Sequence, residues 1–107
     1  MEEKYQVAFE LIMNAGNARA SAMLAIEAAR QYDFEKAAEE LEKAKKEMAL
    51  AHHAQTALIQ QEAQGNSVDV NIILVHAQDH MTMAMMAIDN AKEFMNLYQL
   101  IYQMQSK

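Results

Sequence analysis

Three segments of the chain repeat their apolar residues at intervals of three and four positions. The first runs from Glu2 to Arg30, the second from Phe34 to about Ala63, and the third from about Val70 to Met104. This spacing is typical of amphipathic α-helices, whereas strands alternate apolar and polar residues. The pattern therefore predicts three long helices, each roughly 40 to 50 Å long at 1.5 Å per residue.

Short polar segments separate the three predicted helices. Asp33 is a good N-cap for the second helix, and Gly65 suits the left-handed position that follows a helix. Asp69 or Asn71 can cap the third helix. A short connection makes consecutive helices antiparallel neighbours. The sequence therefore predicts an all-α, antiparallel up-down-up three-helix bundle that forms a single domain over residues 1–107.

The apolar residues also predict which faces of the first two helices are buried. In the first helix, the small residues of segment 14–22 would let another helix approach closely, which would compensate for the helix-weakening Gly16. The positions expected to be buried are Val7, Ala8, Leu11, Ile12, Ala15, Ala18, Ala22, Ala25, Ile26 and Ala29 in the first helix, and Phe34, Ala37, Ala38, Leu41, Lys45, Met48, His52, Gln55 and Ile59 in the second.

The third helix carries more apolar surface than one bundle can cover. A strict alternation of three and four residues predicts a seam that faces the other two helices. Its N-terminal half has further apolar residues on other faces, which predict an exposed patch and self-association through that half. The seam comprises Ile73, His76, His80, Met83, Ala87, Asn90, Phe94, Leu97, Ile101 and Met104, and the further residues are Ile72, Val75 and Met86 on one side and Leu74, Met81, Met85 and Ile88 on another.

Composition supports this reading and excludes several classes of protein. The 107 residues include no proline and two glycines, as expected of a helical chain. The absence of cysteine excludes disulfides, thiol nucleophiles and thiolate metal sites, and is compatible with a cytoplasmic protein. A net charge of −6 argues against nucleic-acid binding. The apolar segment 72–88 is shorter than the roughly 20 residues of a membrane span and contains three ionisable residues, so no membrane insertion is expected.

Candidate chemistry gathers at His76, Asp79 and His80, whose spacing places them on one side of the third helix. A single histidine on an apolar stripe is usually a core residue held by hydrogen bonds, but two histidines with an aspartate between them indicate a site. One hypothesis is a metal-binding or structural interaction module that uses the three residues as ligands. The other is nucleophilic catalysis, because a neutral imidazole can attack phosphorus and form a phosphohistidine.

Four stretches of the chain resemble a known family. They are LVHAQDH followed by MTMAM at 74–85, NAGNARASA at 14–22, the Tyr32-Asp33-Phe34 turn, and the pattern of Ala51, His52, Gln55 and Thr56. Together they resemble the enzyme IIA component of the lactose, cellobiose and diacetylchitobiose class of the phosphoenolpyruvate-dependent sugar phosphotransferase system. His53 departs from the family pattern and is expected to face solvent.

The resemblance implies a phosphocarrier and a role for each site residue. His76 would accept a phosphoryl group from the phosphocarrier protein HPr and pass it to a cysteine of enzyme IIB, with His80 in support. Asp79 would meet its two symmetry mates at the axis of a homotrimer and hold one divalent cation, expected to be Mg²⁺. The HAQDH sequence is more similar to the cellobiose and diacetylchitobiose branch than to the lactose branch.

The resemblance assigns weaker roles to four further polar residues. Gln78 and Gln55 are candidate catalytic residues, because an antiparallel hairpin would place Gln55 level with His80, where it could orient an imidazole. A packing role for Gln55 remains an equal alternative. His52 would lie about a turn farther along, and Arg19 could neutralise phosphate or form a surface ion pair.

Overall fold

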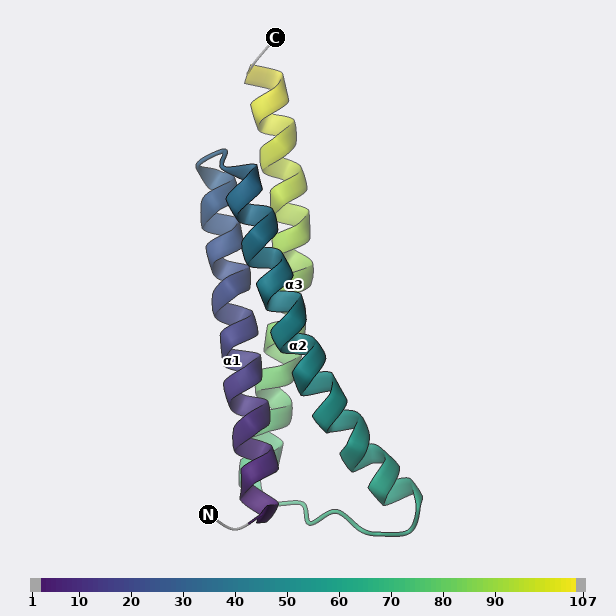
Figure 1. The fold of residues 1–107 in the computed structure, drawn as a ribbon. Helices are drawn as coiled ribbons and strands as arrows, with labels where there is room; N and C mark the ends of the chain where they lie inside the picture. Colours follow the sequence, from purple (N-terminus) through teal and green to yellow (C-terminus); the bar gives the residue numbers. More distant parts are fainter. Residues whose placement is uncertain (1–2, 106–107) are drawn as a thin grey trace.

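The protein folds into three antiparallel helices arranged as an elongated bundle (Figure 1). The computed structural model describes the backbone of residues 3–105 and the side chains of residues 5–105. The helices are α1 (Glu3–Arg30), α2 (Phe34–Ala63) and α3 (Ile72–Gln105). The bundle measures 61 × 25 × 19 Å along its principal axes. The predicted up-down-up architecture is confirmed, and the helix ends agree with prediction to within two residues, although the predicted start at Glu2 lies outside the described residues.

The turns between helices use the local chemistry that the sequence predicts. The Asp33 carboxylate accepts a hydrogen bond from the Lys36 amide at 3.2 Å and caps α2. Gly65 follows α2 with a φ of 90°, a left-handed conformation that glycine adopts without strain. Of the two candidate caps, Asn71 caps α3, because its Oδ1 accepts a hydrogen bond from the Leu74 amide at 3.0 Å. α3 therefore begins one turn before His76.

Alanine dominates the core of the bundle. α1 packs extensively against both other helices, and all ten of its predicted positions are buried or half-buried. Small side chains let helix axes approach closely, so each helix contributes mainly alanine to the contact. The buried apolar residues are Ala8, Leu11, Ala15, Ala18, Ala22, Ala25, Ala28, Ala29, Ala37, Leu41, Ala44, Met48, Ala51, Ala77, Met81, Ala84, Ile88 and Ala91.

The predicted seam of α3 is wrong by about one residue. The prediction followed the large apolar side chains, but the face packed on α1 and α2 contains alanines with Met81 and Ile88. Burying alanine brings the helices together and turns the larger residues outward. His76, Met83, Asn90, Phe94, Leu97, Ile101 and Met104 of the predicted seam are exposed, and Ile73, His80 and Ala87 are half-buried.

The predicted stripe of α2 is also only partly correct. Ala37, Leu41 and Met48 are buried and Phe34 and Gln55 are half-buried, but Ala38, Lys45, His52 and Ile59 are exposed. Ala51 is the last buried residue of α2. Beyond it the helix diverges from α3 toward the long connection at 64–71 (Figure 1), so this end of α2 has little to pack against.

Gly16 does not serve the close helix contact predicted for it. It is exposed on α1, and a Cβ added at this position would meet no atom within 4 Å. The close approach of α1 to its neighbours depends instead on Ala15 and Ala18, which are buried on the opposite side of the helix. Within one chain, the energetic cost of Gly16 is therefore not offset by packing.

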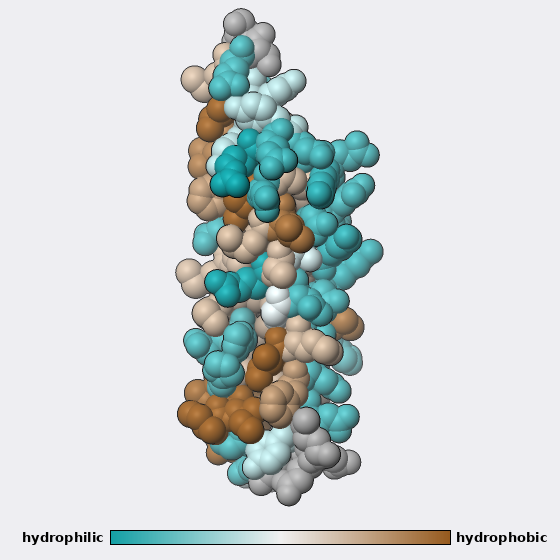
Figure 2. Space-filling view, turned by 90° about the vertical axis from the view of Figure 1, so that its left-hand side faces the viewer, coloured by the Kyte–Doolittle hydropathy of each residue, from teal (hydrophilic) through white to brown (hydrophobic). Residues whose placement is uncertain are grey.

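The surplus apolar surface predicted for α3 is present in full on one side and in part on the other, where Met85 is exposed and Leu74 half-buried. Ile72, Val75 and Met86 are exposed, Ile72 by 80%, whereas Met81 and Ile88 belong to the core. Figure 2 shows one long face of the bundle, on which hydrophobic side chains gather near one end and recur along its length. No helix within residues 3–105 combines the length and apolar character needed to cross a membrane.

Candidate functional site

Two histidines of α3 form a close pair on the surface of the bundle. His76 and His80 lie one helical turn apart, their Nε2 atoms are 3.0 Å apart, and the rings meet edge to face at 82°. His76 is exposed and His80 half-buried. A hydrogen bond needs one donor and one acceptor, so one ring carries its proton on Nε2 and the other presents a lone pair there.

This hydrogen bond restricts the tautomers of the two imidazoles. If His80 donates, His76 carries its proton on Nδ1, and its Nε2 lone pair is held in the hydrogen bond until that bond opens. The first turn of α3 lies immediately upstream, and its free amides carry partial positive charge. A negatively charged group bound at His76 is therefore modestly favoured.

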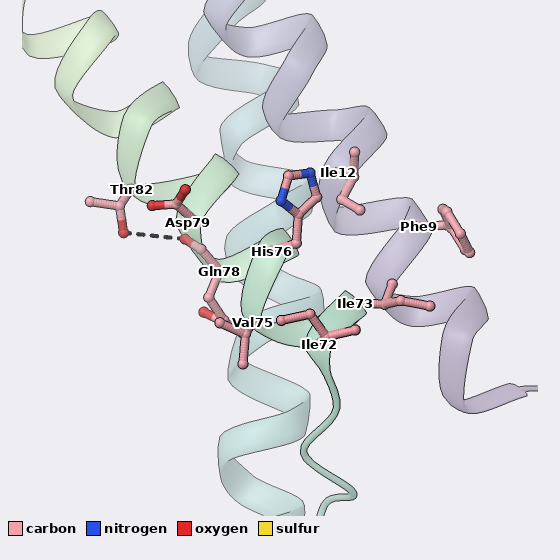
Figure 3. A pocket seen from close by; sticks show the side chains of 9 residues that line it. All are labelled: Phe9, Ile12, Ile72, Ile73, Val75, His76, Gln78, Asp79 and Thr82. Carbon is pink, nitrogen blue, oxygen red and sulfur yellow. Dashed lines mark hydrogen bonds between the residues drawn. The ribbon is translucent and has the colours of Figure 1, made fainter.

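His76 lies in an open, mostly apolar groove of about 650 Å³ between α1 and α3. Figure 3 shows its ring projecting from α3 on the side of α1, with Ile12 and Phe9 across the groove. The groove is lined by Phe9, Ile12, Ile72, Ile73, Val75, His76, Gln78, Asp79 and Thr82. Such a surface suits contact with another protein, because apolar walls surround a small number of polar groups.

Asp79 lies in the same groove but does not complete a metal site within one chain. It is exposed, and its carboxylate makes no hydrogen bond or ion pair to a residue that the structure describes. Among the described residues, no group of three His, Asp or Glu side chains is arranged to hold a metal ion. His76, Asp79 and His80 therefore do not form the ligand set of the metal-binding hypothesis by themselves.

The two candidate glutamines pair with each other and not with a histidine. Gln55 Nε2 on α2 donates to Gln78 Oε1 on α3 at 2.6 Å, and Gln78 Nε2 donates back to Gln55 Oε1. Of the two alternatives for Gln55, these hydrogen bonds favour the packing role, because Gln78 occupies the amide that would orient an imidazole. The pair connects α2 to α3.

A family model describes nearly the whole chain. The model of the lactose/cellobiose-specific IIA subunit of the phosphotransferase system matches residues 6–99. The chain belongs to this family.

Curated relatives and solved structures agree with membership in the IIA family. The chain is 46% identical to the lichenan-specific phosphotransferase enzyme IIA component of Bacillus subtilis, over 94% of this chain and 91% of the relative. It is 40% identical to the lactose-specific EIIA component of Lacticaseibacillus casei, over 99% and 95%. The structure of the cellobiose-specific enzyme IIA from Bacillus anthracis superposes with a TM-score of 0.93 at 42% identity, covering 96% of this chain and 94% of that one.

A further similar structure is that of IIA(Chitobiose) in complex with HPr, from the diacetylchitobiose branch of the Escherichia coli phosphotransferase system. It has a TM-score of 0.81 and 33% identity, and covers 95% of this chain and 99% of that chain.

The remaining polar candidates of this IIA protein lie outside the His76 groove. Arg19 lines a separate groove of about 380 Å³ farther along α1 and α3. His52 lies between α2 and α3 in another groove, with Lys45 and Asp89. His53 is exposed, as expected.

Sequence reasoning missed three residues of the His76 groove. Phe9 and Ile12 form the wall contributed by α1, and Thr82 donates to the Gln78 carbonyl at 3.2 Å. Ile12 was expected in the core of the bundle and is half-buried. Phe9 lies outside the predicted buried stripe of its helix. A large aromatic residue at such a position indicates a contact surface, and this could have identified the groove.

Proposed function

We propose that this IIA protein is a phosphocarrier of the sugar phosphotransferase system. His76 accepts a phosphoryl group from phospho-HPr and passes it to a cysteine of enzyme IIB during uptake of a β-linked disaccharide such as cellobiose or diacetylchitobiose. One observation carries the proposal: His76 is an exposed imidazole whose Nε2 faces a second imidazole at 3.0 Å, in a groove open to another protein. Family membership and the relative solved with HPr support the choice of donor.

The transfer consists of two displacements at phosphorus. The hydrogen bond from His80 opens, the Nε2 lone pair of His76 attacks the phosphorus of phospho-HPr, and the donor's P–N bond breaks with its electron pair returning to the donor imidazole. The His80 Nε2–H then stabilises a phosphoryl oxygen. In the second step a thiolate of enzyme IIB attacks the same phosphorus. The bond to His76 breaks, and the electron pair returns to the His76 ring.

The sugar branch is supported by the pattern of similarity. Relatives named as lichenan-specific and cellobiose-specific share 46% and 42% identity with this chain, whereas lactose-specific relatives share 34% to 40% and IIA(Chitobiose) shares 33%, so the pattern supports the cellobiose alternative. The carrier transfers its phosphoryl group to enzyme IIB and not to the sugar. The sugar therefore influences the carrier only through the choice of its partner enzyme IIB.

The proposed assembly is a homotrimer with Asp79 at its axis. Exposed apolar residues around Asp79 favour association, and the carboxylate has no partner among the residues described here. Three carboxylates at one axis repel each other unless a cation neutralises them or they are protonated. One divalent cation per trimer, Mg²⁺ by its preference for carboxylate oxygens, is the proposed neutralising group.

Phosphorylation of histidine variants tests the proposal. The wild type, His76→Ala, His80→Ala and the surface control His53→Ala are incubated with HPr, enzyme I and labelled phosphoenolpyruvate. We expect no label on His76→Ala, unchanged labelling of His53→Ala, and a roughly two- to tenfold slower rate for His80→Ala from the loss of one hydrogen bond. The label should be acid-labile and base-stable. Labelling of a folded His76→Ala variant at the wild-type rate would refute the proposal.

A further inference from the structure

α3 has two stripes on nearly opposite sides, one packed in the bundle and one facing away from it. The inner stripe is the buried set Ala77, Met81, Ala84, Ile88 and Ala91. At about 100° per residue, the centre of an outer stripe lies roughly 150° from the inner one. The outer stripe comprises Ile72, Asp79, Met83, Met86, Asn90, Leu97, Ile101 and Met104, all of them exposed.

The outer stripe has the spacing of a coiled-coil seam. Its successive members lie three, four or seven residues apart, which is the repeat by which parallel helices interlock. Its large side chains are strongly exposed, Met86 by 59% and Met104 by 73%. A seam of this length on a single surface requires another long helix as its partner.

The last turns of α3 indicate that this partner is α3 of another copy. After Tyr98, every residue described in α3 is exposed, and the helix projects past the turn between α1 and α2 (Figure 1). The outer stripe continues into this projecting end through Ile101 and Met104. A parallel α3 from a second copy would cover the stripe both beside the bundle and beyond it, and would bring identical residues to the same level.

Asn90 interrupts the outer stripe near its middle. It is exposed, its side chain has no hydrogen-bond partner within the described part of the chain, and it lies in a groove beside Met83, Met86 and Phe94. A single asparagine in a coiled-coil seam weakens association, but it selects one register and one number of strands, because amides satisfy each other only at matching heights.

We propose that Asn90 sets the register and the subunit number of the assembly. The inference rests on the proposed trimer and adds the residue that specifies it. Asn90 side chains from parallel copies meet at one level, each amide donating to the carbonyl oxygen of the next. Asp79 lies eleven residues earlier on the same stripe, about 16 Å away at 1.5 Å per residue, so the register fixed by Asn90 also holds the Asp79 carboxylates level.

The test compares Asn90→Leu with Asn96→Leu. Asn96 is exposed on the same helix but lies about 110° from the centre of the outer stripe, so it serves as the matched control. Native mass spectrometry and sedimentation over a dilution series give the oligomeric states. For Asn90→Leu we expect an assembly that resists at least roughly tenfold further dilution but contains more than one oligomeric state. Asn96→Leu and the wild type should form one state, and Asn90→Gln should largely retain it.

Two results would overturn the inference. One is a single trimeric state of wild-type affinity for Asn90→Leu, with helicity confirming that the variant is folded. The other is a wild type that is monomeric at every concentration. Phosphorylation of His76 is measured on the same samples, so that loss of the assembly and loss of the phosphocarrier function are distinguished.

Discussion

The Gln55–Gln78 pair separates a structural role from a catalytic one. Replacing Gln78 by leucine removes both reciprocal hydrogen bonds and leaves the Gln55 amide half-buried without its partner. The surroundings are apolar, because Leu58, Ile59 and Leu74 line the adjoining groove. Each single variant therefore leaves one glutamine amide without its hydrogen-bond partner, in surroundings that cannot hydrate it fully.

The expected loss in free energy of unfolding follows from the two hydrogen bonds between Gln55 and Gln78. Each contributes roughly 0.5–1.5 kcal/mol, so the pair should contribute about 1–2 kcal/mol after allowance for its partial exposure. Gln55→Leu and Gln78→Leu should each lower the free energy of unfolding by about that amount. The double leucine variant should lose no more than one single variant, because its two leucines can pack against each other.

A double-mutant cycle measures this coupling. Urea unfolding of the four proteins is followed at one fixed protomer concentration, since assembly makes apparent stability depend on concentration. The same four proteins are phosphorylated by phospho-HPr, and their initial rates should agree within about twofold if the pair acts only on the fold. A coupling energy near zero, or a large loss of rate in a stably folded variant, would contradict this reasoning.

Two other predictions follow from the backbone and from the proposed trimer axis. Gly16→Ala should raise the free energy of unfolding by roughly 0.5–1 kcal/mol, because the added Cβ meets no atom within 4 Å. Gly65→Ala should lower it by roughly 1 kcal/mol or more, because a φ of 90° strains a residue with a Cβ. Equal effects of the two substitutions on thermal unfolding would contradict this. Asp79→Leu should bind no cation and form a trimer that is at least as stable as the wild type, because the mutual repulsion is removed. Dissociation of that variant in sedimentation would show instead that the cation holds the subunits together.

The sequence predicted the helices well because their signals are local. Periodicity defined three segments, Asp33 and Gly65 marked the turns, and Asn71 was among the two candidate caps of α3. The closeness of His76 and His80 was predicted for the same reason, since it follows from helical spacing alone.

The sequence did not predict which face of α3 is inside. The larger apolar residues favoured a face about one residue away from the buried one, although the alanine stripe through Ala77 and Ala84 permits the closer helix contact. The partner of Gln55 was missed because it depends on the relative rotation and height of two helices, which decide whether His80 or Gln78 faces it. Both errors concern tertiary packing, which local periodicity does not determine.

The most direct measurement of the central claim locates the phosphoryl group on the intact protein. The wild-type chain is reacted briefly with phospho-HPr, digested at neutral to basic pH, and fragmented in a mass spectrometer. We predict a single phosphohistidine at position 76, which disappears when enzyme IIB is added. A phosphoryl group on His80, His52 or His53 with His76 unmodified would contradict the account.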